Sequence, residues 1–117
     1  MTKNKKRFTI GVLVGGIMDD ITRYVCRGVM QEARTADVNV VVFPGKYWER
    51  DLSDNRELMY EYQYSTVFSY ARKENVDALI ISAGSIGCFT SKKGMEDMLK
   101  QFKDIPCVLI ASKIEGY

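Results

Sequence analysis

Four short apolar runs alternate with three amphipathic segments along the chain. The apolar runs are rich in β-branched residues and occupy residues 8–14, 38–43, 78–82 and 106–111. Nearly continuous apolar strands are typical of a parallel sheet that is covered on both faces. The pattern therefore predicts an α/β fold class with the element order β-α-β-α-β-α-β.

The alternation also restricts how the strands can be arranged. Right-handed crossover connections leave few topologies for such a chain. We expect a three-layer fold with a parallel four-stranded sheet of order 2-1-3-4, which is the flavodoxin-like arrangement. Its switch point lies between the first and third strands, and ligands of open α/β sheets bind beside it at the carboxyl ends of the strands.

The first amphipathic segment follows Asp19 and Asp20, either of which can cap a helix by accepting hydrogen bonds from its first free N–H groups. Its apolar residues recur at helical spacing and define one face that we expect to be buried. The residues of this face are Ile21, Val25, Gly28, Val29, Ala33 and Ala36.

Two further helices are predicted. The second covers residues 58–74, and the third follows a cap at Thr90 or Ser91. The expected buried face of the second consists of Tyr60, Tyr64, Val67, Phe68 and Ala71, and that of the third of Met95, Met98, Leu99 and Phe102. Residues 45–57 are polar and form the longest predicted loop.

Composition and charge exclude several classes of function. The net charge of +2 is uneven, because Lys3, Lys5, Lys6 and Arg7 contribute +4 and the remaining 13 bases (17 − 4) face 15 acids. We interpret residues 1–7 as a basic tail or linker, since a nucleic-acid-binding domain carries its basic face on the folded body. No apolar run reaches the roughly 18 residues that cross a bilayer, so no membrane partner is expected.

Histidine is absent, which excludes His-dependent nucleophiles and most zinc sites. Cys26, Cys88 and Cys107 are far apart, so neither a disulfide framework nor a metal knuckle is predicted, and free thiols favour a cytoplasmic location. We expect no metal and no cofactor.

Candidate ligand-binding residues follow the strands. The turn after the first strand holds Gly16, Asp19 and Asp20, which either form a turn and a helix cap or bind ligand hydroxyls through a carboxylate. Tyr47 and Trp48 are a loop aromatic pair that either packs on the domain or stacks on a flat ligand.

The small-residue turn after the third strand offers further polar groups. Ser82 and Ser85 either belong to a tight strand-to-helix turn or bind a ligand hydroxyl or an anion. The turn at residues 15–20 is neither a G-x-G-x-x-G nor a P-loop motif, so no nucleotide-phosphate site is predicted.

Catalysis is not expected. A phosphate-accepting receiver domain shares the same alternation of elements, but it needs an aspartate at the end of the third strand. Here that strand ends in Ile81 and Ser82, and Asp19 and Asp20 come about five residues late for the receiver's acidic pair. No candidate nucleophile has a nearby base in the sequence, so the chain is predicted not to be an enzyme.

Four motifs occur in order along the chain. Residues 8–14 read FTIGVLV, residues 27–33 RGVMQEA, residues 76–81 VDALII and residues 105–110 IPCVLI. Together they resemble the type I periplasmic-binding-protein-like effector domain of LacI/GalR-family regulators, whose patterns include R-G-[IV]-x-x-E-A and V-D-G-[IL]-I-[IL]. Ala78 stands where that strand usually has glycine.

The resemblance implies that residues 8–117 are part of the N-terminal lobe of a ligand-sensing domain. Such a domain binds a small molecule, such as a sugar or nucleoside, between two lobes and usually forms a homodimer. DNA would be contacted only through a domain absent from this chain. By analogy, Ser112 joins the ligand-facing residues. Two alternatives stay open: a receiver-like domain without phosphoacceptor, and a dimerisation module of a sensor fused to another output domain.

Overall fold

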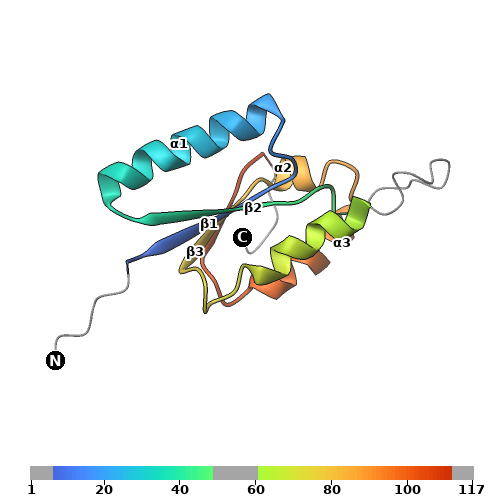
Figure 1. The fold of residues 1–117 in the computed structure, drawn as a ribbon. Coiled ribbons are helices and arrows are strands. Elements are labelled where there is room, and N and C mark those ends of the chain that lie inside the picture. The colour runs from blue at the N-terminus through green and yellow to red at the C-terminus, as the bar shows by residue number, and fades with distance from the viewer. Residues whose placement is uncertain (1–6, 49–60, 112–117) are drawn as a thin grey trace.

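The computed structural model describes residues 7–48 and 61–111. Figure 1 shows one sheet with α1 on one face and the remaining longer helices on the other. The strands are β1 (Thr9–Val14), β2 (Asn39–Pro44), β3 (Ala78–Ile81) and β4 (Cys107–Leu109). The α-helices are α1 (Asp20–Ala36), α2 (Ala83–Ile86) and α3 (Lys92–Leu99), and the 3₁₀ helices are η1 (Glu61–Tyr70) and η2 (Lys100–Phe102).

The sheet confirms the predicted fold class and topology. All three strand pairings are parallel, and the order is β2-β1-β3-β4. Leu13 of β1 lies opposite Phe43 of β2 and Ile81 of β3, so these side chains share one face of the sheet. Each strand runs in the same direction, and all four carboxyl ends therefore meet at one edge.

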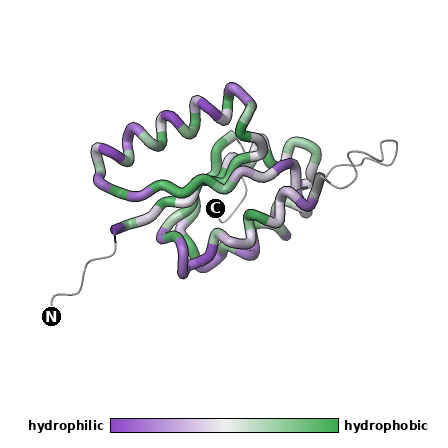
Figure 2. The backbone as a smooth tube through the Cα atoms, viewed as in Figure 1, coloured by the Kyte–Doolittle hydropathy of each residue, from purple (hydrophilic) through white to green (hydrophobic). Residues whose placement is uncertain are grey.

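The hydrophobic core fills the layer between this face and the helices η1, α3 and η2. Phe68 of η1, Met98 of α3 and Phe102 of η2 are fully buried against Leu79 and Ile81. Figure 2 shows the hydrophobic strands at the centre of the molecule, whereas hydrophilic residues recur along α1. The face predicted for the third helix is confirmed, because Met95, Met98, Leu99 and Phe102 are all buried.

The second helical segment differs from the prediction. Within the described residues it is a 3₁₀ helix over Glu61–Tyr70 and not an α-helix over residues 58–74. The buried residues Ser65, Phe68 and Ala71 are spaced three apart, which matches the three residues per turn of a 3₁₀ helix. Tyr64, predicted on the buried face, is 61% exposed, and Tyr60 lies outside the described residues.

The buried face of α1 also differs from the prediction. Thr22 and Ala33 are buried, whereas Ile21 is 68% exposed and Gly28 and Ala36 are exposed as well. The helix packs mainly over β2, so its inner face turns toward that side of the sheet.

The helix termini show the expected capping chemistry. Asp19 caps α1, and its carboxylate accepts a hydrogen bond from the backbone N–H of Ile21. Ser91 caps α3, and its hydroxyl accepts from the backbone N–H of Gly94 at 3.0 Å. The predicted turn over residues 83–87 contains the one-turn helix α2.

No helix within residues 7–48 and 61–111 combines the length and apolar character needed to cross a membrane.

Candidate functional site

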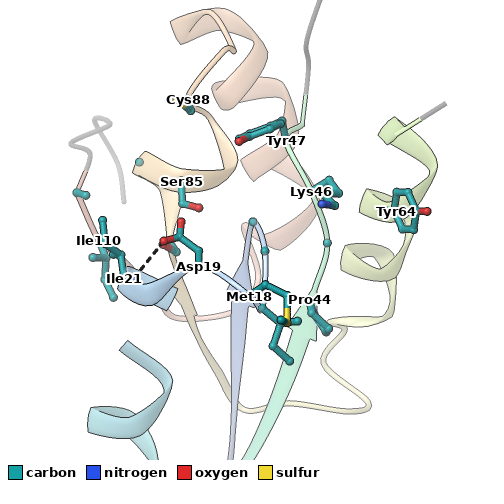
Figure 3. Close-up of a pocket in the computed structure, with 17 residues that line it drawn as sticks. Met18, Asp19, Ile21, Pro44, Lys46, Tyr47, Tyr64, Ser85, Cys88 and Ile110 are labelled. Atoms are coloured by element: carbon teal, nitrogen blue, oxygen red, sulfur yellow. Dashed lines mark hydrogen bonds between the residues drawn. The ribbon is translucent and has the colours of Figure 1, made fainter. Parts of the chain in front are cut away.

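A cavity of about 690 Å³ lies at the carboxyl edge of the sheet, where the loops after β1, β2 and β3 converge (Figure 3). This volume is in the range of small-molecule sites in proteins. Its described lining residues are Gly15, Gly16, Ile17, Met18, Asp19, Ile21, Pro44, Gly45, Lys46, Tyr47, Tyr64, Ser82, Gly84, Ser85, Cys88, Ile110 and Ala111. The cavity occupies the switch point between β1 and β3, where the fold class places ligands.

Asp19 presents a carboxylate to the cavity from the loop between β1 and α1. Its Oδ1 atom accepts the N–H of Ile21 at 3.1 Å, which fixes the side chain at the start of the helix. The positive end of the helix dipole also favours a negative charge at this position. The carboxylate keeps further acceptor capacity, because each oxygen of an ionised carboxyl can accept two hydrogen bonds.

Two serines line the cavity from the segment after β3: Ser82 is the N-cap residue of α2, and Ser85 lies within α2. Ser82 is buried, and its backbone N–H donates to the carbonyl of Leu13 at 2.9 Å, so the end of β3 is tied to β1. Ser85 packs directly on the β1 loop, because a Cβ added to Gly15 would lie 2.6 Å from the Ser85 hydroxyl oxygen. Only a glycine at position 15 allows this close approach without a shift of Ser85.

The loop after β2 brings Lys46 and Tyr47 to the opposite wall. The hydroxyl of the buried Ser65, on η1, lies 3.2 Å from the carbonyl oxygens of both Lys46 and Tyr47. The ring of Tyr47 meets Phe89 edge to face, with centroids 4.7 Å apart and an interplanar angle of 83°. These contacts hold the tyrosine ring beside the cavity, as Figure 3 shows.

The cavity therefore combines opposite charges, hydroxyls and apolar surface. Asp19 and Lys46 contribute the two charged side chains, and Tyr47, Ser82 and Ser85 contribute hydroxyl groups. Ile17, Met18 and Ile110 add apolar walls. Such a set suits recognition of a polar organic molecule by hydrogen bonds and by contact with its carbon skeleton.

Burial changes the chemistry of two thiols away from this cavity. Desolvation raises the pKa of Cys26 and of Cys107 above the usual thiol value. Both thiols therefore favour the protonated form and are poor nucleophiles.

Among the described residues, no group of three or more Cys, Asp or Glu side chains is arranged to hold a metal ion.

The structure brings five of the eight predicted site residues to one cavity: Gly16, Asp19, Tyr47, Ser82 and Ser85. Two others, Asp20 and Trp48, do not line it. Asp20 points away, and its carboxylate lies 3.8 Å from the Arg23 guanidinium on the surface of α1. Trp48 packs partly buried against the hydrophobic core, and Ser112 lies outside the described residues.

Twelve of the seventeen described lining residues were not among the predicted set, and three of these twelve carry a charged, hydroxyl or thiol group: Lys46, Tyr64 and Cys88. Lys46 directly precedes Tyr47, which was predicted to bind the ligand, and this adjacency in the sequence could have indicated that Lys46 also lines the cavity. Tyr64 was assigned to the core from a 3.6-residue period, which the 3₁₀ geometry of η1 does not follow. Cys88 follows α2, and its sequence context gave no indication of the cavity.

The end of β3 carries a serine at the position where a receiver domain has its phosphoacceptor. Ser82 follows β3 directly, and Asp19 serves as the cap of α1.

Comparison of the chain with protein-family models, curated proteins and solved structures gave no match. The site's own geometry therefore carries the argument for function.

Proposed function

We propose that this chain is a ligand-sensing module that binds a small polar molecule, such as a sugar or nucleoside, in the cavity at the carboxyl edge of its sheet. Asp19 accepts hydrogen bonds from ligand hydroxyls, and Ser82 and Ser85 donate or accept on the adjacent wall. Tyr47 packs its ring against the ligand. The chain binds without covalent chemistry.

The observation that carries the proposal is the convergence of three separate loops on one cavity. Asp19, Tyr47 and Ser85 come from the connections after β1, β2 and β3, and all three line the same 690 Å³ space. Each side chain is held by a contact within the fold: the Ile21 N–H, the Phe89 ring and the close packing on Gly15. Side chains that are held in place before binding lose less entropy when a ligand arrives.

The resemblance of residues 8–14, 27–33, 76–81 and 105–110 to LacI/GalR-type effector domains supports the same proposal. In a two-lobed sensor of that type, a ligand that contacts both lobes favours the closed state. It thereby shifts the population of the attached dimer or output domain. The cavity described above would supply one wall of that site.

Thermal denaturation in the presence of sugars, nucleosides and polyols tests the proposal. A ligand present at ten times its dissociation constant stabilises the folded state by about 1.4 kcal/mol. For a domain of this size, that stabilisation corresponds to a rise of the melting temperature by roughly 4 °C or more. We expect at least one compound class to give a saturable shift of this size at millimolar concentration.

Two matched variants assign the binding to the cavity. Asp19→Asn keeps a good helix cap but removes the negative charge. Asp20→Asn makes the same charge change on the neighbouring residue, which lies on the exposed surface of α1. We expect Asp19→Asn to abolish the shift and Asp20→Asn to retain it. Equal loss in both variants, or no shift with any compound, would contradict the proposal.

A further inference from the structure

A groove runs along the outer edge of the sheet, between α1 and β2. A hollow of about 760 Å³ is continued by a second of about 450 Å³, and the two share Met30 and Arg34. The first is lined by Ile17, Thr22, Arg23, Cys26, Arg27, Met30, Gln31, Arg34 and Val42. Val40 lines the second, so the groove follows β2 along its length.

The edge of β2 offers backbone groups for pairing. β2 is the terminal strand of the sheet, and β1 is its single neighbour among the described strands. Asn39 and Gly45 donate their N–H groups to β1, at Phe8 and Val14. Because pairing alternates along a strand, Val40 and Val42 direct their N–H and C=O groups outward. An unpaired strand edge of this kind is a template for an added strand.

A row of arginines borders the groove. Arg23, Arg27 and Arg34 lie on the side of α1 that lines it. Within the described part of the chain, neither Arg27 nor Arg34 forms an ion pair, and Arg23 has only a 3.8 Å contact with Asp20. Asp37, which lines the second hollow, pairs with Arg7, so the charges of Arg27 and Arg34 are the ones that no described acidic side chain neutralises in the groove.

A buried polar group in the groove supports an external partner. The Thr22 side chain is 1% exposed, and its hydroxyl has no hydrogen-bond partner among the described residues. Buried hydroxyls in folded proteins are nearly always hydrogen-bonded. Thr22 lines the groove together with Arg23 and Val42, so the unpaired hydroxyl lies directly beneath the surface on which a molecule would be seated.

We propose that this groove docks an extended acidic segment of a partner protein, which adds a strand to the edge of β2. Carboxylates at alternate positions of that strand lie about 6.7 Å apart. Arg23 and Arg27 are four residues apart on α1 and therefore differ by about 6 Å along its axis. The spacing lets two successive acidic residues pair with Arg23 and Arg27, while the backbone bonds to Val40 and Val42, and Arg34 adds positive charge farther along the groove.

The positive charge of the groove favours an acidic partner over a second copy of the chain. A symmetric pairing of two β2 edges would bring two rows of arginines toward each other, and juxtaposed like charges oppose association. The unpaired backbone groups of Val40 and Val42 favour a peptide over a nucleic acid, because a peptide strand alone completes the sheet ladder.

Fluorescence polarisation with a labelled seven-residue peptide of alternating valine and glutamate tests the proposal on the 117-residue chain. We expect saturable binding that a peptide of alternating valine and lysine does not show. The double variant Arg27→Gln/Arg34→Gln removes the two unpaired arginines and should weaken binding about tenfold. The matched control Lys92→Gln/Lys93→Gln removes the same charge from exposed positions on α3 and should leave the affinity unchanged.

Backbone methylation of the peptide separates strand addition from charge attraction without altering the protein. N-methylation of the glutamates and N-methylation of the valines block opposite edges of the peptide strand. We expect one of these peptides to lose binding at least tenfold and the other to retain it. Equal binding of both, or equal affinity of the two charge variants, would overturn the proposal.

Two other outcomes also overturn it. One is arginine-dependent binding of a single-stranded oligonucleotide with no binding of the acidic peptide. The other is concentration-dependent self-association in sedimentation that Arg27→Gln/Arg34→Gln strengthens, again with no peptide binding. The melting temperature and circular dichroism of each variant establish that the compared proteins are folded.

Discussion

Gly45→Ala tests the contact that attaches η1 to the end of β2 and so positions the Tyr47 loop. A Cβ at position 45 would lie 2.5, 2.9 and 3.0 Å from three ring carbons of Phe68. Ordinary carbon contacts are about 3.5–4.0 Å, so the overlap amounts to about 1 Å. The Phe68 ring is fully buried within the hydrophobic core, so a shift of the ring would disturb its packing neighbours. The backbone at Gly45 is not in the left-handed region, so the cost is steric.

We expect Gly45→Ala to lower the free energy of unfolding by about 1–3 kcal/mol, the usual cost of overpacking a core. For a domain of this size, the melting temperature should fall by roughly 4–12 °C. Urea denaturation followed by circular dichroism measures the change. Gly28→Ala is the matched control, because nothing lies within 4 Å of the added methyl group in the middle of α1. It should raise the unfolding free energy by about 0.5–1 kcal/mol.

A double-mutant cycle identifies the cause. In a Phe68→Leu background the ring is gone, and Gly45→Ala should then cost less than about 0.5 kcal/mol. A neutral Gly45→Ala variant would refute the reasoning. An equal cost with and without the Phe68 ring would also refute it, because the destabilisation would then come from another contact.

Four further outcomes are expected. Ser91→Ala removes the cap of α3 and should lower the unfolding free energy by about 1 kcal/mol in urea titrations; no change would contradict the capping role. Thr22→Val removes a buried unpaired hydroxyl and should raise the unfolding free energy of the free chain by about 1 kcal/mol, whereas a fall would show that the hydroxyl has a partner. At pH 8, iodoacetamide should modify the exposed Cys88 before Cys26 and Cys107, as peptide mass mapping would show; the reverse order would contradict the burial assignment. Because burial raises the pKa of Cys26 and Cys107, the folded state holds these protons more tightly than the unfolded state. The contribution of these two bound protons to the stability of the folded state is therefore complete below the unfolded thiol pKa of roughly 8.5. It is lost as the pH rises through the higher folded pKa, so the free energy of unfolding measured across this range should fall.

The arrangement of the sheet could be predicted because strand identity depends on local composition. Runs such as residues 8–14 and 78–82 are apolar and β-branched, and right-handed crossovers then leave the order 2-1-3-4. The topology alone brings the carboxyl ends of the parallel strands to one edge of the sheet. The sequence therefore predicts that the segments containing Gly16, Asp19 and Ser85 lie at that edge.

The helix η1 could not be predicted from periodicity. Its residues include Tyr, Ser, Thr, Val and Phe, which all have modest α-helix propensity, so packing decides the local geometry. A few apolar side chains fit a period of three about as well as 3.6, and the burial of Ser65, Phe68 and Ala71 decides between them. The exposure of Tyr64 and its place at the cavity follow from that difference.

The sequence also did not determine which of two neighbouring side chains faces the cavity. Asp19 and Asp20 are chemically identical neighbours, and both can cap a helix. The start of α1 at Asp20 makes Asp19 the cap and places it at the cavity, while the carboxylate of Asp20 faces Arg23 on the surface. Trp48 similarly follows Tyr47 directly, yet Trp48 packs on the core and Tyr47 lines the cavity. Residue type does not distinguish these two aromatic side chains.

Mapping of ligand contacts by amide chemical shifts tests whether the cavity at the carboxyl edge of the sheet is the ligand site. The ¹⁵N-labelled chain would be titrated with the sugar, nucleoside or polyol that gives the largest thermal shift. We expect saturable shift changes confined to amides that line the cavity or flank it, which are those of residues 15–21, 45–47, 64, 82–88 and 110–111. Changes spread along α3, or no changes at saturating ligand, would contradict the assignment of this cavity as the ligand site.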